Sequence, residues 1–169
     1  MTGVAACAEA GRAAEPTGAT PVEPQPVLAA ELDMDEFDPC SALTQAQAGQ
    51  LGVGSPRPGT SSEGTRSCIW AHYEFEPRET FYVDATDLIG IESIDTVGEP
   101  FRVGPFTAVN ARGRLQNFER SCSIVLSVRP GQILQVNYGY HGARPMTHDQ
   151  ACRRALEAAQ MVVENLTRR

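Results

Sequence analysis

The sequence predicts an α+β fold in which one antiparallel sheet packs against helices near both ends of the chain. In the middle of the chain, short stretches alternate between apolar and polar residues, and a Pro-Gly pair separates two of them. Helix-capping motifs stand before and after this region. The length of 169 residues suits one domain. We therefore expect a single α+β domain over residues 38–169, with a sheet of four to five strands, N-terminal and C-terminal helices, and two disulfides.

The first expected element is a helix that begins at Asp38. Asp38 can cap it, and Pro39 suits the first turn, where a backbone N–H has no partner within the helix. Thr44 and Gln47 add a capping signal of the Thr-x-x-Gln kind. A glycine-rich stretch then ends the helix, and residues 54–66 have the composition of a loop.

The middle of the chain predicts strands. Residues 68–75 have apolar side chains on both faces, as in a central strand, and a turn joins them to a second strand at 80–84. Residues 106–112 form a third candidate strand, whereas residues 85–100 show no clear period. The clearest hairpin spans residues 122–138, because Pro130-Gly131 suits the central positions of a type II turn.

The last expected element is a helix capped by Thr147 and Gln150, which form a capping box. Apolar residues then recur three or four positions apart and predict one stripe that packs on the sheet. The stripe consists of Cys152, Leu156, Ala159, Val163 and Leu166.

Charge divides the chain into an acidic tail and a neutral domain. Residues 1–39 hold eight acidic residues and one arginine, whereas residues 40–169 hold 13 acidic residues and 13 arginines. Because no basic face is predicted, we expect no nucleic-acid partner. Residues 8–30 contain four prolines and almost no large apolar residues, which predicts a flexible tether. Residues 1–37 are therefore assigned to a lipobox remnant and this tether.

Five cysteines stand at positions 7, 40, 68, 122 and 152, without the CxxC pairs of a zinc finger. The last four lie at positions with a buried pattern, which predicts two disulfides and an oxidising compartment. Three pairings are possible. Cys68 and Cys122 both begin strands, and Cys40 and Cys152 both lie in first turns of helices. We therefore expect the pairs Cys68–Cys122 and Cys40–Cys152.

Cys7 closes the sequence Val4-Ala5-Ala6-Cys7, which has the pattern of a bacterial lipobox. In such a motif the cysteine thiol receives a diacylglyceryl group. Six residues before Cys7 are fewer than a signal peptide requires, so we expect the natural precursor to begin further upstream. The expected location is the outer face of the plasma membrane, through a lipid anchor on Cys7, or outside the cell as a secreted protein.

Several of these segments together resemble a known family. They are DPCSALTQAQAGQLG at 38–52, CIW at 68–70, CSIVLSV at 122–128, and Cys152-Arg153-Arg154-Ala155 in the last helix. The set resembles a family of actinobacterial lipoproteins named domain of unknown function three-five-five-eight. The resemblance covers residues 38–166 and implies a lipobox cysteine, a low-complexity tether and a domain with four ordered cysteines. Cys7, Cys40, Cys68, Trp70, Cys122 and Cys152 occupy the corresponding positions.

The sequence shows no catalytic constellation, no nucleotide-binding loop and no calcium loop. His148 and Cys152 could lie on one helical face as metal ligands, but a disulfide at Cys152 removes that role. We therefore expect no enzyme activity, no metal and no cofactor. Tyr138, Tyr140 and His141 leave the last strand as a candidate binding platform for a sugar or peptide.

The expected function is that of a monomeric, lipid-anchored module that binds an envelope ligand or protein. The alternatives are a small extracytoplasmic hydrolase and a structural accessory of an envelope transport or secretion system.

Overall fold

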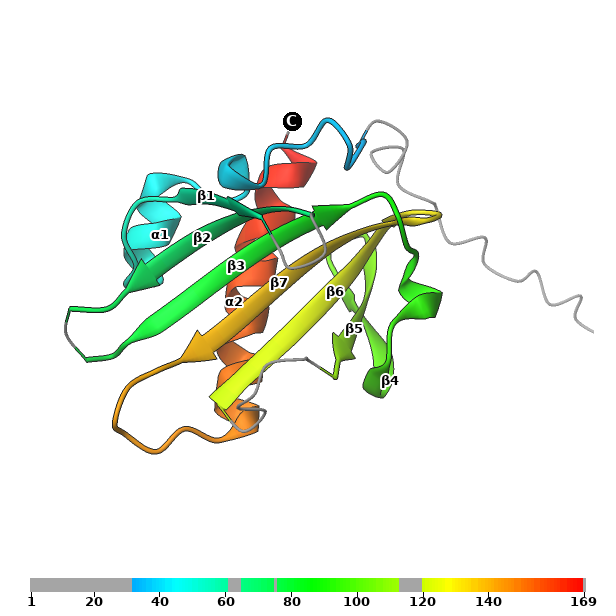
Figure 1. The fold of residues 1–169 in the computed structure, drawn as a ribbon. Coiled ribbons are helices and arrows are strands. Elements are labelled where there is room, and N and C mark those ends of the chain that lie inside the picture. The colour runs from blue at the N-terminus through cyan, green and yellow to red at the C-terminus, as the bar shows by residue number, and fades with distance from the viewer. Residues whose placement is uncertain (1–31, 61–64, 75, 113–119, 169) are drawn as a thin grey trace, which may run out of the picture.

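The structure is a computed structural model that describes residues 32–60, 65–74, 76–112 and 120–168. These residues form a seven-stranded antiparallel sheet with the order β1-β2-β3-β7-β6-β5-β4 (Figure 1). The strands are β1 Arg57–Thr60, β2 Arg66–His72, β3 Glu79–Thr86, β4 Thr96–Val103, β5 Phe106–Ala111, β6 Ser121–Arg129 and β7 Gln132–Tyr140. The helices are the short 3₁₀ turns η2 Pro39–Ser41 and η3 Ile91–Ser93, and the α-helices α1 Gln45–Gln50 and α2 His148–Thr167.

The predicted α+β class and antiparallel sheet are confirmed, but the expected number of four to five strands is wrong. β1 was missed because Arg57–Thr60 contains Pro58 and Gly59 and has no alternation. Such a strand is tolerated at the sheet edge, where it pairs only with β2. β4 was missed because its pairing with β5 shifts register between Val97 and Phe101, and this irregularity interrupts the period of two.

The two hairpins expected in the middle of the chain are present. β2 pairs antiparallel with β3, and β6 pairs antiparallel with β7. Gly131 lies between β6 and β7 with a φ of 75°. Position i+2 of a type II turn requires such a positive φ, which glycine adopts without steric cost.

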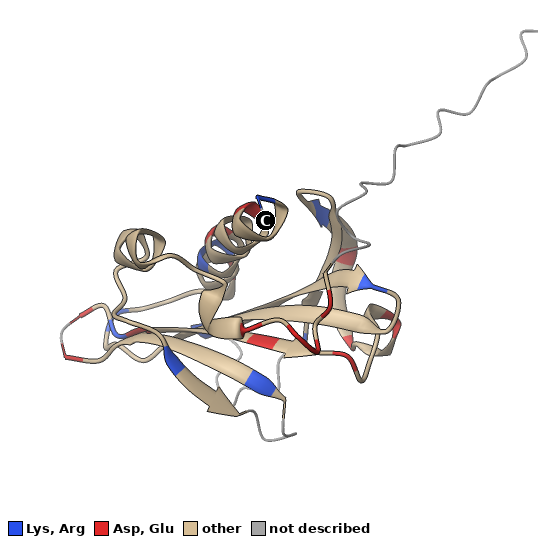
Figure 2. Cartoon of the chain, turned by 90° about the horizontal axis from the view of Figure 1, so that it is seen from above, with Lys and Arg blue, Asp and Glu red and all other residues tan. Residues whose placement is uncertain are grey.

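Both expected helix starts are confirmed, although the N-terminal helix is divided in two. The Asp38 side chain accepts a hydrogen bond from Cys40 N at the start of η2. Capping boxes begin α1 at Thr44 and α2 at Thr147. α1 and α2 lie on the same face of the sheet (Figure 2), where Asn165 donates a hydrogen bond to Ala42 O at 2.8 Å.

The apolar face of α2 differs in part from the expected stripe. Cys152 and Leu156 are only half-buried, while four alanines face inward. The buried residues of α2 are Ala151, Ala155, Ala158, Ala159, Val162, Val163 and Leu166. Because alanine is short, the helix can lie close to β6 and β7.

The core lies between the sheet and the two α-helices, around the fully buried Trp70, Phe81 and Tyr138. The opposite side of the sheet, here called the second face, carries a smaller apolar cluster of Val109, Val125 and Ile133. In the described part of the chain, the arginines are spread over several elements (Figure 2). Within the described ranges, no helix is both long and apolar enough to span a bilayer.

The folded domain begins earlier than the expected boundary at residue 38. Met34 is 0% exposed and Phe37 is 5% exposed, so both belong to the core. Arg66 of β2 donates hydrogen bonds to the carbonyls of Met34 and Phe37 and fixes this segment. The expected lipidation residue Cys7 and the expected tether at 8–30 lie outside the described residues.

Two disulfides are present, but the expected pairing is wrong. Cys40 is bonded to Cys68, and Cys122 is bonded to Cys152, with Cα–Cα distances of 5.0 and 4.9 Å. The sheet order explains the difference, because β3 and β7 lie between β2 and β6. Three strand spacings separate Cys68 from Cys122 by roughly 14 Å, about twice what a disulfide can span. Each bond instead joins a strand to the helical element that packs over it.

Candidate functional site

The second face of the sheet carries hydrogen-bonding side chains on four neighbouring strands. Side chains alternate along a strand, so Phe81, Val83, Val136 and Tyr138 enter the core while the residues between them point to the opposite face. We call five of these the polar row. It consists of Ser67 of β2, Asp84 of β3, Gln135 and Asn137 of β7, and Ser123 of β6.

The polar row is joined by short hydrogen bonds. Asn137 donates its Nδ2 to Asp84 Oδ2 at 2.8 Å. Gln135 Nε2 donates to Asn137 Oδ1 at 2.8 Å and to Ser123 Oγ at 2.7 Å. Ser67 lies directly opposite Asp84 in the β2–β3 register and bonds its carboxylate. These contacts fix five side chains relative to one another.

Burial changes the acidity of the row's carboxyl group. Asp84 is half-buried, and desolvation raises its pKa above the ordinary value. The hydrogen bonds from Ser67 and Asn137 act in the opposite direction but are smaller. Asp84 therefore loses its proton at a higher pH than a solvent-exposed aspartate does.

Aromatic residues extend the same face beside the polar row. Tyr82 lies two residues before Asp84 on β3, and its pKa is raised by burial and then by its contact with Tyr73. The Tyr73 hydroxyl accepts a hydrogen bond from Thr80 Oγ1 at 3.2 Å. The ring of His141 lies 6.2 Å from that of Tyr73, between centroids. Tyr73 and His141 are exposed, so their rings are open to contact from solvent.

The candidate platform expected from Tyr138, Tyr140 and His141 is not a continuous surface. Alternation along β7 turns Tyr138 and Tyr140 into the interior, where they are 0% and 4% exposed. Tyr138 OH donates to Glu79 Oε1 at 2.8 Å, and Tyr140 OH donates to Glu76 Oε2 at 3.0 Å. Of the three, only His141 is exposed, and ligand binding by it stays a prediction.

The sequence interpretation missed the polar row, although one signal was present. Gln135 and Asn137 alternate with apolar residues on β7, the central strand of the sheet, where an outward-facing position would usually be apolar or solvated. Their partners Asp84 and Ser67 lie on other strands, so their contact follows only from the strand order.

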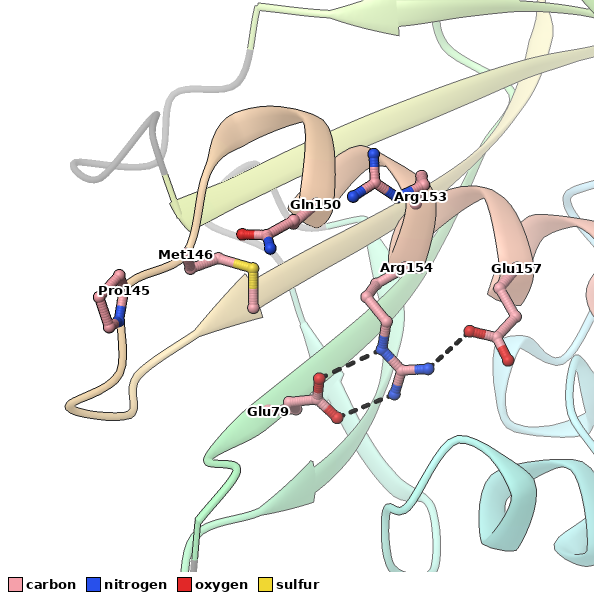
Figure 3. A pocket seen from close by; sticks show the side chains of 7 residues that line it. All are labelled: Glu79, Pro145, Met146, Gln150, Arg153, Arg154 and Glu157. Carbon is pink, nitrogen blue, oxygen red and sulfur yellow. Dashed lines mark hydrogen bonds and ion pairs between the residues drawn. The ribbon is translucent and has the colours of Figure 1, made fainter.

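A pocket of about 310 Å³ lies on the other side of the sheet, between β3 and the start of α2 (Figure 3). Its centre is an ion pair in which Arg154 Nη2 and Nε contact Glu79 Oε2 and Oε1 at 2.8 and 3.2 Å. Arg154 Nη1 also bonds Glu157 at 2.6 Å. The remaining lining residues are Pro145, Met146, Gln150 and Arg153.

The charges at the centre of this pocket neutralise each other. Burial alone would lower the pKa of Arg154, but the hydrogen bonds and charges of Glu79 and then of Glu157 more than offset it and raise the pKa. Tyr138 donates a hydrogen bond to the same carboxylate, and burial together with Glu79 raises the pKa of its phenol. We interpret this network as a connection between α2 and β3, because its opposite charges are paired across these two elements.

Two of the histidines contact backbone carbonyls through their rings. His72 Nδ1 lies 3.0 Å from Pro77 O, and His148 Nδ1 lies 3.0 Å from Ser121 O. His148 Nε2 lies 3.4 Å from Cys152 Sγ, so the spacing noted in the sequence does bring these two side chains together. Cys152 is, however, bonded to Cys122.

Comparison with known proteins identifies the family. The model of the family described as "Protein of unknown function (DUF3558)" matches residues 2–165. Neither a curated protein nor a solved structure is significantly similar to the chain. The match extends over almost the whole sequence and includes all five cysteines. The chain therefore belongs to the DUF3558 family.

Proposed function

We propose that this protein is a non-enzymatic binding module of the cell envelope that holds a hydroxyl-rich ligand, such as an oligosaccharide, on the second face of its sheet. The observation that carries the proposal is the polar row. It sets five hydrogen-bonding side chains side by side across β2, β3, β7 and β6.

The chemistry of the row suits hydroxyl groups. A sugar hydroxyl both donates and accepts, and the half-buried Asp84 and Gln135 offer carboxylate and amide groups that can do the same. The other three residues of the row, Ser67, Ser123 and Asn137, are buried and hold these two in place. The raised pKa of Asp84 weakens the case for a strongly cationic ligand, and the row carries no basic side chain for an anionic one. Exposed Tyr73 and His141 offer ring faces for the apolar side of a sugar.

The strands hold these groups in place before a ligand arrives. β7 is the middle strand of seven, and the hydrogen bonds of Gln135 and Asn137 restrict their rotamers. Side chains that are fixed in advance lose less conformational entropy on binding, which favours affinity.

We further propose that the domain is held at the outer face of the plasma membrane by a lipid on Cys7. Two disulfides are typical of an oxidising, extracytoplasmic compartment. The proline-rich composition of residues 8–30 supports an extended tether of several tens of ångström, at roughly 3 Å per residue. A monomer on such a tether could reach ligands in the cell wall.

Ligand binding is tested by NMR titration of the ¹⁵N-labelled protein with soluble oligosaccharides of N-acetylglucosamine, arabinose or mannose. We expect amide shifts to concentrate on β3 and β7 around Asp84 and Asn137. Gln135→Ala should weaken binding at least tenfold, because it removes the central amide of the row. The matched control is Arg153→Ala, at the pocket on the other face, which should leave affinity unchanged. Shifts elsewhere, equal effects of the two variants, or no binding by any sugar would contradict the proposal.

The anchor is tested separately by expressing the chain behind a lipoprotein signal peptide in a bacterium that processes lipoproteins. The protein should partition into detergent and carry the mass of a diacylglyceryl group, and Cys7→Ser should lose both properties. A Cys40→Ser, Cys68→Ser double variant should keep them. Recovery of the protein from the aqueous phase with an unmodified Cys7 would contradict the proposed lipid anchor, but it would leave the ligand proposal untouched.

A further inference from the structure

One disulfide lies beside a histidine in an arrangement that resembles a metal site. The Sγ atoms of Cys122 and Cys152 and a ring nitrogen of His148 all lie within 4.8 Å of one another. In the part of the chain that the structure describes, the Cys40–Cys68 disulfide belongs to no such group. The two disulfides therefore differ in what surrounds them.

The orientation of His148 is the second observation. Its Nδ1 lies 3.0 Å from the carbonyl oxygen of Ser121, which can only accept a hydrogen bond, so Nδ1 carries the ring proton. Nε2 is then unprotonated in the neutral ring, and it points at Cys152 Sγ from 3.4 Å. Histidines that bind metals are held in the same way, with one nitrogen on a backbone carbonyl and the other on the ion.

We propose that the Cys122–Cys152 disulfide is the oxidised form of a Cys₂His site that, once reduced, binds a thiophilic divalent ion such as Zn²⁺. The distances suit this ion. Zn–S and Zn–N bonds of about 2.3 and 2.0 Å place tetrahedral ligand atoms roughly 3.5 Å apart. The 3.4 Å between His148 Nε2 and Cys152 Sγ already meets this requirement, and the two sulfurs must separate for the ion to enter.

The reducing step needs a dithiol. A thiolate of the dithiol attacks Sγ of Cys152, the more exposed residue of the two, and Cys122 leaves as a thiolate. The second thiol of the reductant then attacks its own mixed disulfide, so that the reductant becomes a cyclic disulfide and Cys152 is released. Two electrons and two protons pass to the protein. Metal binding afterwards releases the two thiol protons.

The site is accessible and has an open position. His148 and Cys152 lie half-buried in the first turns of α2, so an ion can approach from solvent. Two thiolates and one imidazole leave the fourth tetrahedral position to water, as in zinc sites that bind an exogenous ligand. Because the disulfide blocks the site, the metal is held only under reducing conditions.

The test uses a Cys7→Ser form of the full chain, so that every thiol comes from the two disulfides. A water-soluble phosphine reduces them and becomes a phosphine oxide with oxygen from water, and it is then removed without air. Titration with Co²⁺ should give thiolate-to-cobalt charge-transfer bands and tetrahedral d–d bands, with one ion per chain that Zn²⁺ displaces. The unreduced protein should show none of these bands.

Three variants make the assignment specific. His148→Ala should weaken Co²⁺ binding at least tenfold, whereas His72→Ala, on β2 and three strands away from Cys122 of β6, should have no effect. A Cys40→Ser, Cys68→Ser variant should still bind one ion. Equal binding by His148→Ala, or loss of binding without Cys40 and Cys68, would overturn the proposal. So would a reduced protein whose near-ultraviolet circular dichroism from buried Trp70 disappears and is not restored by the metal.

Discussion

Arg154 and Glu79 form a two-point ion pair that joins α2 to β3 across 75 residues of sequence. The carboxylate also accepts a hydrogen bond from the Tyr138 hydroxyl, and the guanidinium also donates to Leu51 O at 2.7 Å. Glu79 is nearly buried, with a side chain 7% exposed. Arg154 thus connects α2 to β3 and to the end of α1, and Tyr138 of β7 joins the same carboxylate.

We expect Arg154→Leu to destabilise the domain strongly. Loss of the guanidinium leaves the Glu79 carboxylate buried without a counter-charge, which typically costs about 3–5 kcal/mol. Urea unfolding followed by circular dichroism measures the change. Arg168→Ala is the control, because both side chains of its ion pair with Glu164 are exposed to solvent. Such a pair should contribute less than about 1 kcal/mol. Equal losses in the two variants would contradict the role given to the buried pair.

The two disulfides should contribute similar amounts to stability. They close loops of 28 and 30 residues, for which the chain-entropy estimate is about 3.6 kcal/mol each. The double variants Cys40→Ser, Cys68→Ser and Cys122→Ser, Cys152→Ser should therefore melt well below the parent, by comparable margins. Calorimetry checks the melting, and peptide mapping without reduction checks the pairing. Recovery of a peptide linking Cys68 to Cys122 would contradict the structure.

Local signals in the sequence were sufficient to predict where the helices begin. The capping boxes at Thr44 and Thr147 need only residues three positions apart, and both are present. The turn at Gly131 was also predictable, because the type of a turn depends on the few residues that form it. The predicted α+β class follows from such signals together with alternation.

Features that depend on strand order could not be predicted. The correct cysteine pairs require knowing that β3 and β7 separate β2 from β6. The polar row has the same origin, because Asp84 and Asn137 are 53 residues apart in sequence. Met34 was placed outside the domain, since no periodic pattern marks a short irregular segment that enters the core.

Asp84 predicts a pH dependence of stability. Its pKa is raised in the folded state above the ordinary 3.8, mainly by burial, so the folded protein holds this proton more tightly than the unfolded chain does. The stabilising contribution of the protonated form is therefore lost as the pH rises from 3.8 through the folded pKa. Asp84→Asn should remove this decrease and be more stable than the parent at neutral pH. Unfolding free energies between pH 3 and 7 test this, and parallel curves for the two proteins would contradict it.

Two glycines in hairpin turns share a left-handed backbone but differ in their surroundings. Gly131, between β6 and β7, has a φ of 75° and no heavy atom within 4 Å of the position of a Cβ. Gly104, between β4 and β5, has a φ of 56°, and a Cβ there would lie 2.6 Å from Val163 Cγ1 of α2. Val163 is buried and β-branched, so it has little freedom to move away.

We expect Gly104→Ala to be more destabilising than Gly131→Ala. Both variants place a side chain in the left-handed region, at about 1–2 kcal/mol each. Only Gly104→Ala also forces a methyl group against α2, and such overpacking typically adds about 1–3 kcal/mol. Chemical unfolding of the two variants gives the difference. If the clash is its cause, combining Gly104→Ala with Val163→Ala should cost less than the sum of the single changes, because the second removes the atom that the first meets. Strict additivity would instead mean that β4–β5 and α2 do not touch at this turn.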